Sequence, residues 1–159
     1  KHWSPFEMAD MTFEIETSRG VAAQILRHRS FSFQEFSQRY SNALEQCDLE
    51  LRLEHATSRQ SSSDIVGDES ELYAIADKAL EASQTAYNQL IEAGVAKECA
   101  RGILPLNTKT RMYMKGSIRS WIHYCQVRCE ETTQKEHRDI ACAIRDQLIA
   151  QIPSVANIV

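Results

Sequence analysis

The segment Met11-Thr12-Phe13-Glu14-Ile15-Glu16 alternates apolar and polar side chains. Because successive side chains of a strand point to opposite faces, this alternation predicts a half-buried β-strand. Thr17 or Ser18 can cap a following helix, since either hydroxyl accepts a hydrogen bond from a free backbone N–H group. We therefore expect a strand, a turn over 17–20 and a helix over 21–28.

Further along the chain the spacing of apolar residues becomes helical. The clearest helix is expected over 71–93, where Gly94 is a typical C-cap. Its apolar stripe comprises Leu72, Ile75, Ala76, Ala79, Ala86, Tyr87, Leu90 and Ile91. Helices are also expected over 96–102, 117–128 and 134–150, and a second strand over 110–114. The helix over 117–128 is expected to bury Ile118, Trp121, Ile122 and Cys125. The helix over 134–150 is expected to bury Ile140, Ala143, Ile144 and Leu148.

Two segments lack this periodicity. Residues 30–40 are rich in aromatic and hydroxyl side chains, which favours extended or irregular structure. Residues 56–70 are rich in serine, aspartate and glycine, which predicts a mobile surface loop. We expect an α+β fold, with a small, mostly antiparallel sheet packed with long helices in a single domain over 1–159.

The composition excludes several classes of protein. The 159 residues are 43% hydrophobic and 25% charged, as in globular proteins. No apolar run approaches the ~20 residues that cross a membrane. The net charge of −4 lacks the basic excess of nucleic-acid binders. We therefore expect neither membrane nor nucleic acid as a partner. The five irregularly spaced cysteines favour a reducing, cytoplasmic setting over a secreted disulfide framework.

Arginine supplies twelve of the 18 basic residues, and its densest group is Gln24-x-x-Arg27-His28-Arg29, followed by Ser37-Gln38-Arg39-Tyr40. On a helix, positions 24, 27 and 28 would share one face. The planar guanidinium fork suits phosphate, so we interpret the group as a site for a small anion, with Ser37 and Arg39 on its phosphate. Glu35 is expected to orient an arginine or to accept from a ligand amide. The alternatives are a solvated basic helix end and a nucleophilic Ser37, which no neighbouring base supports.

A zinc site is a further alternative at His123-x-Cys125-x-x-x-Cys129. The cysteines lie one helical turn apart, but the chain lacks a Cys-x-x-Cys pair and a second set of ligands. We interpret these cysteines as buried structural residues and expect no metal.

Four motifs follow one another in a fixed order. They are His2-Trp3-Ser4-Pro5-Phe6-Glu7, the group Arg27-His28-Arg29 with Ser37 after seven residues, Glu98-Cys99-Ala100-Arg101-Gly102-Ile103-Leu104-Pro105-Leu106, and the set Arg119-Ser120-Trp121-Ile122-His123, Arg128 and Gln134-Lys135-Glu136. Together they resemble the motifs of flavin-dependent thymidylate synthases over nearly the whole chain. The sequence of residues 30–40 is most similar to that of members from large DNA viruses, phages and some bacteria.

This resemblance implies an FAD-dependent methyltransferase that makes dTMP from dUMP. In the family, methylenetetrahydrofolate supplies the carbon, NADPH-reduced FAD supplies the hydride, and homotetramers share active sites between subunits. The family uses no cysteine nucleophile, which agrees with the absence of an activated cysteine cluster in the sequence.

The resemblance also implies roles for individual residues. The FAD-binding positions are Ser4, Arg27, His28, Arg29, Glu35, Ser117, Arg119 and His123. The dUMP-binding positions are Gln24, Arg27, Glu35, Ser37, Gln38, Arg39, Arg101 and Arg128. Arg128 matches the arginine thought to ionise uracil N3, and is the expected catalytic residue. A guanidinium beside N3 favours the deprotonated ring.

The chain also departs from the family's usual pattern. Ser117 and His123 stand where the family usually has asparagine, Gln34 replaces another asparagine, and Thr132 replaces a histidine. The family's usual first strand and helix do not precede His2, so we expect a fragment or a chain whose start is not shown. The alternative function is therefore a truncated nucleotide- and flavin-binding module without turnover. A third hypothesis is a helical interaction protein that uses the apolar stripe between Leu72 and Ile91.

Overall fold

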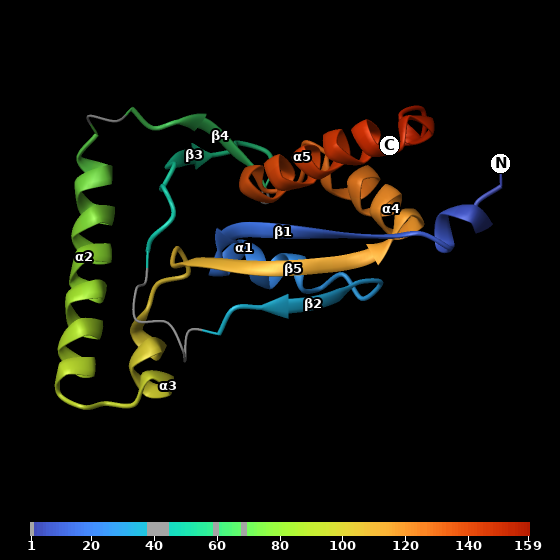
Figure 1. The fold of residues 1–159 in the computed structure, drawn as a ribbon. Helices are drawn as coiled ribbons and strands as arrows, with labels where there is room; N and C mark the ends of the chain where they lie inside the picture. The colour runs from blue at the N-terminus through green and yellow to red at the C-terminus, as the bar shows by residue number, and fades with distance from the viewer. Residues whose placement is uncertain (1, 38–44, 59–60, 68–69) are drawn as a thin grey trace.

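A three-stranded antiparallel sheet lies at the centre of the computed structural model, which describes residues 2–37, 45–58, 61–67 and 70–159 (Figure 1). The strand order is β1 (Asp10–Ser18), β5 (Lys109–Ser117) and β2 (Ser32–Glu35). The pairing of β1 with β5 aligns residue 10 with residue 117 and residue 18 with residue 109. Both predicted strands are confirmed, and each extends beyond its predicted ends.

The two faces of the sheet differ in polarity. Phe13, Ile15, Met112 and Met114 are buried on one face, as the alternation predicted. The other face carries charged residues of both signs, and Lys115 Nζ lies 3.2 Å from an Asp10 carboxylate oxygen. Helices therefore have one apolar face to cover.

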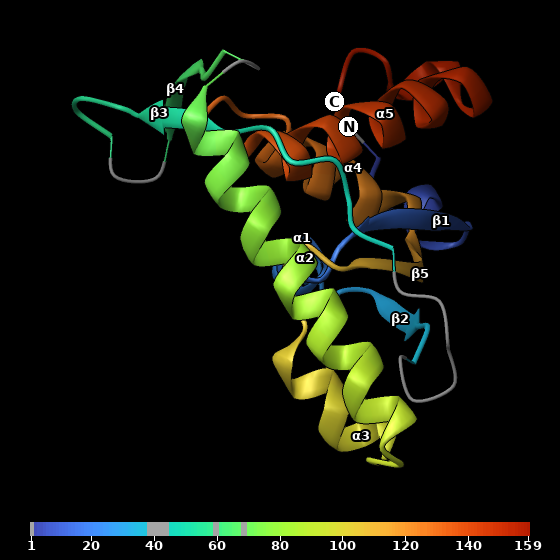
Figure 2. The same cartoon turned by 90° about the vertical axis from the view of Figure 1, so that its left-hand side faces the viewer.

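Helices α1 (Arg19–Ile25), α4 (Ile118–Arg128) and α5 (Lys135–Gln151) pack with the apolar face in one core (Figures 1 and 2). Serines at the strand ends start the first two of these helices. The Ser18 side chain accepts from Val21 N, and the Ser117 side chain accepts from Ser120 N, each at 3.3 Å. Each long strand of the sheet thus continues directly into a capped helix.

Two details of these helices differ from the prediction. α1 ends at Ile25, and residues 26–28 follow as a turn in which His28 N donates to Ile25 O. Here the backbone N–H groups of Arg27 and His28 donate to carbonyls three residues earlier, instead of four, which tightens the end of the helix. The chain then reverses into β2. In α5, Ala143 is exposed, so its predicted burial was wrong; the buried face is His137, Ala141, Ile144 and Leu148.

A two-stranded antiparallel hairpin, β3 (Arg52–Glu54) and β4 (Ser62–Ile65), lies beside α5. β4 falls within residues 56–70, which the sequence predicted to be a loop, so that prediction was wrong for 62–65. The hairpin shows no apolar alternation because no residue of either strand is buried, and even Leu53 and Ile65 are exposed. Polar contacts hold it instead, such as Arg52 Nε donating to Ser62 Oγ at 2.8 Å.

The long helix α2 (Glu71–Glu92) lies across the end of the sheet where β1 ends and β5 begins (Figure 2). It contacts α3 (Lys97–Ala100) and the 3₁₀ turn η2 (Arg101–Ile103), and Ser83 Oγ donates to Ile103 O. Gly94 follows the helix with a φ of 84°, which confirms the expected C-cap. Leu72 and Ile75 are 48% and 66% exposed, so this half of the stripe is not core within the chain.

Short 3₁₀ turns complete the structure at both ends, η1 (Ser4–Glu7) and η3 (Pro153–Val155). η1 packs against α4, and η3 packs against α5. Within the described ranges, no helix is both long enough and apolar enough to cross a membrane.

The close approach of β5 to Phe31 gives a test of the core. A Cβ atom on Gly116 would lie 2.4 Å from Phe31 Cδ1, whose ring centre lies 4.5 Å from that of Trp121. We expect Gly116→Ala to lower the free energy of unfolding by about 1–3 kcal/mol, because the ring has to shift. Gly102→Ala is the matched control, since no atom lies within 4 Å of its added Cβ. Urea denaturation of both variants checks this, and equal stabilities would contradict the packing.

Candidate functional site

The contact between Arg128 and His28 joins the end of α4 to the turn after α1. Arg128 Nε donates to His28 Nε2 at 2.9 Å. Because a guanidinium can only donate, His28 must accept at Nε2, which makes the imidazole neutral with its proton on Nδ1. Burial, with the charges of Arg128 and His123, lowers the pKa of His28 to about 4. Two residues that the sequence singled out are thus brought together by the fold.

A buried wall of rings lies behind this contact. Tyr124 Oη and His137 Nε2 are 3.1 Å apart, and the centre of the His28 ring lies 5.0 Å from that of Tyr124. Burial, then the charges of Arg128 and His28, lowers the pKa of His137 to about 4. Burial also raises the pKa of Tyr124. The wall is therefore neutral near pH 7, while Arg128 carries a charge.

A second group of predicted residues surrounds a pocket of about 530 Å³ beside η1 and α4. Glu7 organises it, since its carboxylate accepts from Ser117 Oγ at 3.1 Å and pairs with Arg119 Nη1 at 3.1 Å. Arg119 and His123 lie one turn apart on exposed positions of α4. The pocket is lined by Trp3, Glu7, Ser30, Arg119, Ser120, Ile122, His123 and Gln126. Ser4 is exposed in η1, next to the pocket residue Trp3.

A third group forms around Glu35 at the end of β2. Its carboxylate accepts from Arg19 Nη1 at 2.8 Å and from Thr110 Oγ1 at 2.9 Å. Glu35 therefore orients an arginine, as predicted, although the partner is Arg19 and not a member of the Arg27 group. Arg19 and Arg101 both line a neighbouring pocket of about 350 Å³, as does the acidic Glu98. Guanidinium groups beside a cavity suit an anionic ligand.

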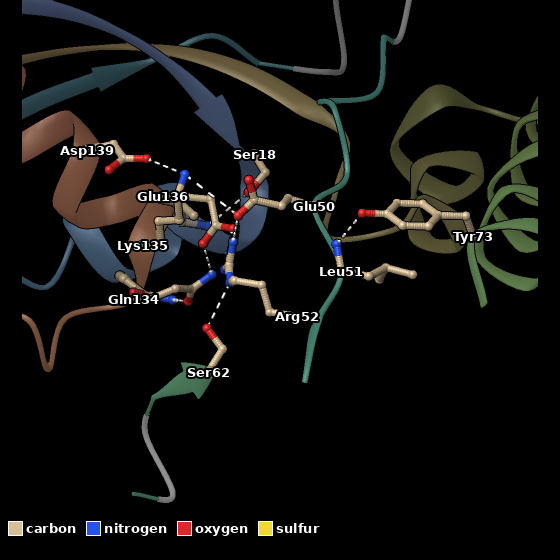
Figure 3. Close-up of polar contacts among 12 residues, drawn as sticks. Ser18, Glu50, Leu51, Arg52, Ser62, Tyr73, Gln134, Lys135, Glu136 and Asp139 are labelled. Atoms are coloured by element: carbon tan, nitrogen blue, oxygen red, sulfur yellow. Dashed lines mark hydrogen bonds and ion pairs between the residues drawn. The ribbon is translucent and has the colours of Figure 1, made fainter. Parts of the chain in front are cut away.

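Gln24 lies apart from these groups, on the side of α1 that faces the start of α5. Its Nε2 donates to Gln134 Oε1 at 2.6 Å. Gln134 belongs to a polar cluster with Glu136 and Arg52 from the hairpin (Figure 3). Although burial raises the pKa of Glu136, hydrogen bonds from Arg52 and Gln134 lower it overall.

The remaining predicted residues that the structure describes line neither of the two pockets above. Arg27 and Arg29 are exposed, and Ser37 is half-buried just after β2. Gln38 and Arg39 lie outside the described residues. Because Arg27 and His28 follow the end of α1, the predicted helix face shared with Gln24 is wrong.

The positions of the cysteines do not support the alternative of a zinc site. Cys125 is buried in the core and its Sγ lies 3.9 Å from Ala141 O. The described residues contain no group of three or more His, Cys, Asp or Glu side chains able to hold a metal ion. The predicted burial is confirmed for Cys125 and was wrong for Cys129, which is only half-buried at the end of α4.

Sequence reasoning gave no site role to the residues that position the others, namely Glu7, Arg19, Tyr124, Gln134 and His137, although Glu7 and Gln134 were named within motifs. Most of these act through contacts between distant segments, which local spacing cannot reveal. His137 is the exception, because it shares a three- and four-residue spacing with Ala141, Ile144 and Leu148. This spacing can be read in the sequence, and it defines a helix face that is rotated relative to the predicted one.

Comparisons with known proteins identify the family. Residues 1–154 match the family described as thymidylate synthase complementing protein. The chain is 54% identical over 157 residues to the flavin-dependent thymidylate synthase of Synechocystis sp., covering 98% of this chain and 73% of that relative. It is 48% identical over 160 residues to a probable flavin-dependent thymidylate synthase of Paramecium bursaria Chlorella virus 1, covering 99% and 74%. A Thermus thermophilus relative with the same function in its name is 35% identical over 155 residues, covering 96% and 57%.

The chain therefore belongs to the thymidylate synthase complementing protein family. This confirms the resemblance, including the similarity to viral and bacterial members.

The buried His137 predicts a pH dependence of stability. Its pKa is about 4 when folded and about 6.5 in an unfolded chain, so only the unfolded state gains a proton between those values. The contribution of neutral His137 to the free energy of unfolding is therefore fully present above pH 6.5, and it is lost as the pH falls towards 4. We expect the stability difference between wild type and His137→Gln to decrease by about 2 kcal/mol from pH 7 to pH 5. Urea denaturation at both values checks this, and a constant difference would contradict it.

Proposed function

We propose that the protein is a flavin-dependent thymidylate synthase, which converts dUMP to dTMP with methylenetetrahydrofolate as carbon donor and NADPH-reduced FAD as hydride donor. The observation that carries this proposal is the contact between Arg128 and a neutral His28 in front of a buried neutral wall. The names of the similar proteins support it. The roles of the expected FAD-binding and dUMP-binding residues are part of this proposal.

The pocket beside η1 fits part of an FAD molecule. Arg119 and His123 offer nitrogen groups for its diphosphate, and the half-buried Trp3 offers an aromatic face for one of its rings. Glu7 holds the Arg119 guanidinium at the pocket. Ser117 contacts Glu7 and Ser4 lies in η1, whereas Arg27, His28 and Arg29 lie between α1 and β2, and Glu35 ends β2. When bound, FAD supplies the hydride of the reaction.

Arg128 is proposed to act on the uracil ring. A guanidinium at N3 favours the deprotonated ring and thereby raises the electron density at C5, which loses its proton and gains the methyl group. His28 occupies only Nε of Arg128, and no hydrogen bond joins the Nη groups to the described part of the chain. Those groups can therefore face a ligand. The neutral wall adds no competing charge, and burial strengthens the effect of the guanidinium.

Arg101, Gln24 and Glu35, with Ser37, Gln38, Arg39 and Arg27, are proposed to hold the rest of dUMP. Arg101 lines a pocket that suits a phosphate, next to the Arg19–Glu35 pair. Among the described residues, this pocket and the pocket beside η1 share no lining residue, and Arg128 lines neither of them.

A homotetramer with shared active sites would explain this separation. The exposed apolar side chains Leu72 and Ile75 on α2 support such an assembly, since burying them against another copy is favourable. The alternative, a nucleotide- and flavin-binding module without turnover, makes the same binding contacts and differs only in the reaction.

The visible absorption spectrum of concentrated purified protein, repeated during titration with FAD, is the first test. We expect an oxidised-flavin spectrum or a saturable perturbation of added FAD, and a flat response would contradict a working flavin site. The second measurement is release of tritium from dUMP labelled at C5, with NADPH and methylenetetrahydrofolate present. Release supports the synthase, whereas flavin binding without release favours the module.

The role of Arg128 is tested by Arg128→Ala. We expect turnover to fall by about 10²–10³-fold, the cost of removing one preorganised donor, while the FAD dissociation constant changes by less than about threefold. Arg145→Ala is the matched control, because Arg145 pairs with Asp146 on the surface of α5 and should leave turnover unchanged. Tritium release and FAD titration measure the two quantities, and retained turnover in Arg128→Ala would refute the assignment.

A further inference from the structure

A continuous series of hydrogen bonds runs from the β3–β4 hairpin to α1. Arg52 donates from Nε to Ser62 Oγ at 2.8 Å and from Nη2 to Glu136 Oε1 at 2.6 Å. Glu136 Oε2 accepts from Gln134 Nε2 at 2.8 Å, and Gln134 Oε1 accepts from Gln24 Nε2 at 2.6 Å. Figure 3 shows the part between Ser62 and Gln134. The series joins residues up to 110 positions apart in the sequence.

The charges in this series determine which way each amide points. Arg52 can only donate, and its pairing with Glu136 favours the ionised carboxylate, which can only accept. Gln134 must therefore turn its NH₂ group to Glu136 and its oxygen to Gln24. Gln24 in turn must offer its NH₂ group to Gln134. Its amide oxygen has no hydrogen bond to the described residues and remains as an acceptor.

We propose that Gln134 and Glu136 are positioning residues that hold the Gln24 amide so that its oxygen accepts a hydrogen bond from the bound nucleotide. This inference rests on the proposed function, in which Gln24 is a dUMP-binding residue. The donor that dUMP can offer to this oxygen is the sugar 3′-hydroxyl, because the proposed function places the ring N3 against Arg128. An amide turned the other way would present NH₂, which repels such donors, so the orientation decides which ligand group can be bound.

A purely structural role for the Gln24–Gln134 bond does not fit its surroundings. The bond is exposed to solvent, and neither glutamine belongs to the apolar core. Neutral hydrogen bonds in contact with water contribute little to stability. Losing this bond is therefore expected to change ligand affinity while the fold remains intact.

The test is a double-mutant cycle with Gln24→Met and Gln134→Met, which keep side-chain length but remove the hydrogen bond. Isothermal titration calorimetry of FAD-loaded protein with dUMP measures the affinity. We expect each single variant to bind dUMP about three- to tenfold more weakly. The double variant should equal Gln24→Met alone, because Gln134 acts only through Gln24. Glu136→Gln should also weaken binding, since a neutral amide no longer determines the orientation of Gln134.

Matched controls separate positioning from general damage. Arg138 lies in the first turn of α5 beside the same residues, but its Nη1 donates to Glu131 O and not into the series. Arg138→Met should bind dUMP as the wild type does. FAD affinity should be unchanged in all variants, and thermal unfolding should be unchanged in Gln24→Met and Gln134→Met, which leave the Arg52–Glu136 ion pair in place. The analogue without the 3′-hydroxyl identifies the donor, because Gln24→Met should not weaken its binding further if that hydroxyl is the partner.

Each outcome has a distinct meaning. If Gln24→Met weakens binding and Gln134→Met does not, or if their effects add, the positioning role is overturned while the proposed function stands. The same holds if wild type binds dUMP and Gln24→Met binds it equally well. If the wild type binds FAD but no dUMP, the proposed function fails and this inference fails with it. If Gln134→Met does not fold, unchanged dUMP binding by Glu136→Gln overturns the role.

Discussion

Trp121 anchors α4 to the sheet, and the rest of the site depends on that contact. Its ring centre lies 4.8 Å from that of Phe13 and 4.5 Å from that of Phe31, and its indole N–H donates to Met11 O at 3.0 Å. A buried tryptophan with a satisfied N–H has little freedom to rotate or slide. Because the axial position and rotation of α4 are thereby set, its exposed side and its last turn also have defined positions. Arg119 and His123 lie on that side, and Arg128 lies at the end.

The electrostatics of the site follow from the same packing. Tyr124 and His137 are buried behind Arg128, and burial keeps both neutral. A charged group beside neutral, desolvated neighbours exerts a stronger field than it would in water. Acidic residues are placed elsewhere, where they hold arginines in position, as Glu7 holds Arg119 and Glu35 holds Arg19. The chain thus uses carboxylates to orient Arg119 and Arg19 and a neutral histidine to orient Arg128.

The elements that the sequence predicted well are those with one buried face. The strand over 11–16 and the helix with Trp121 each show a clear apolar period, because burial selects the residues at every second or every third and fourth position. The hairpin of β3 and β4 has no such buried face, and Arg52 and Ser62 connect its strands by a side-chain hydrogen bond. No local pattern in the sequence therefore predicts it. The helix α5 was predicted correctly as a helix, but its buried face was assigned with Ile140 and Ala143 in place of His137 and Ala141.

By itself the sequence determined the α+β class, the principal strands and helices, the family, and the residue types that the reaction requires, since these depend on local spacing and on motifs. Tertiary structure alone decided which of those residues meet. Arg128 and His28 are 100 positions apart, and Gln24 and Gln134 are 110 apart. Their contacts result from packing helices on a sheet, a global property in which every buried side chain takes part. The pKa of His137 likewise depends on burial by distant segments, which no stretch of sequence contains on its own.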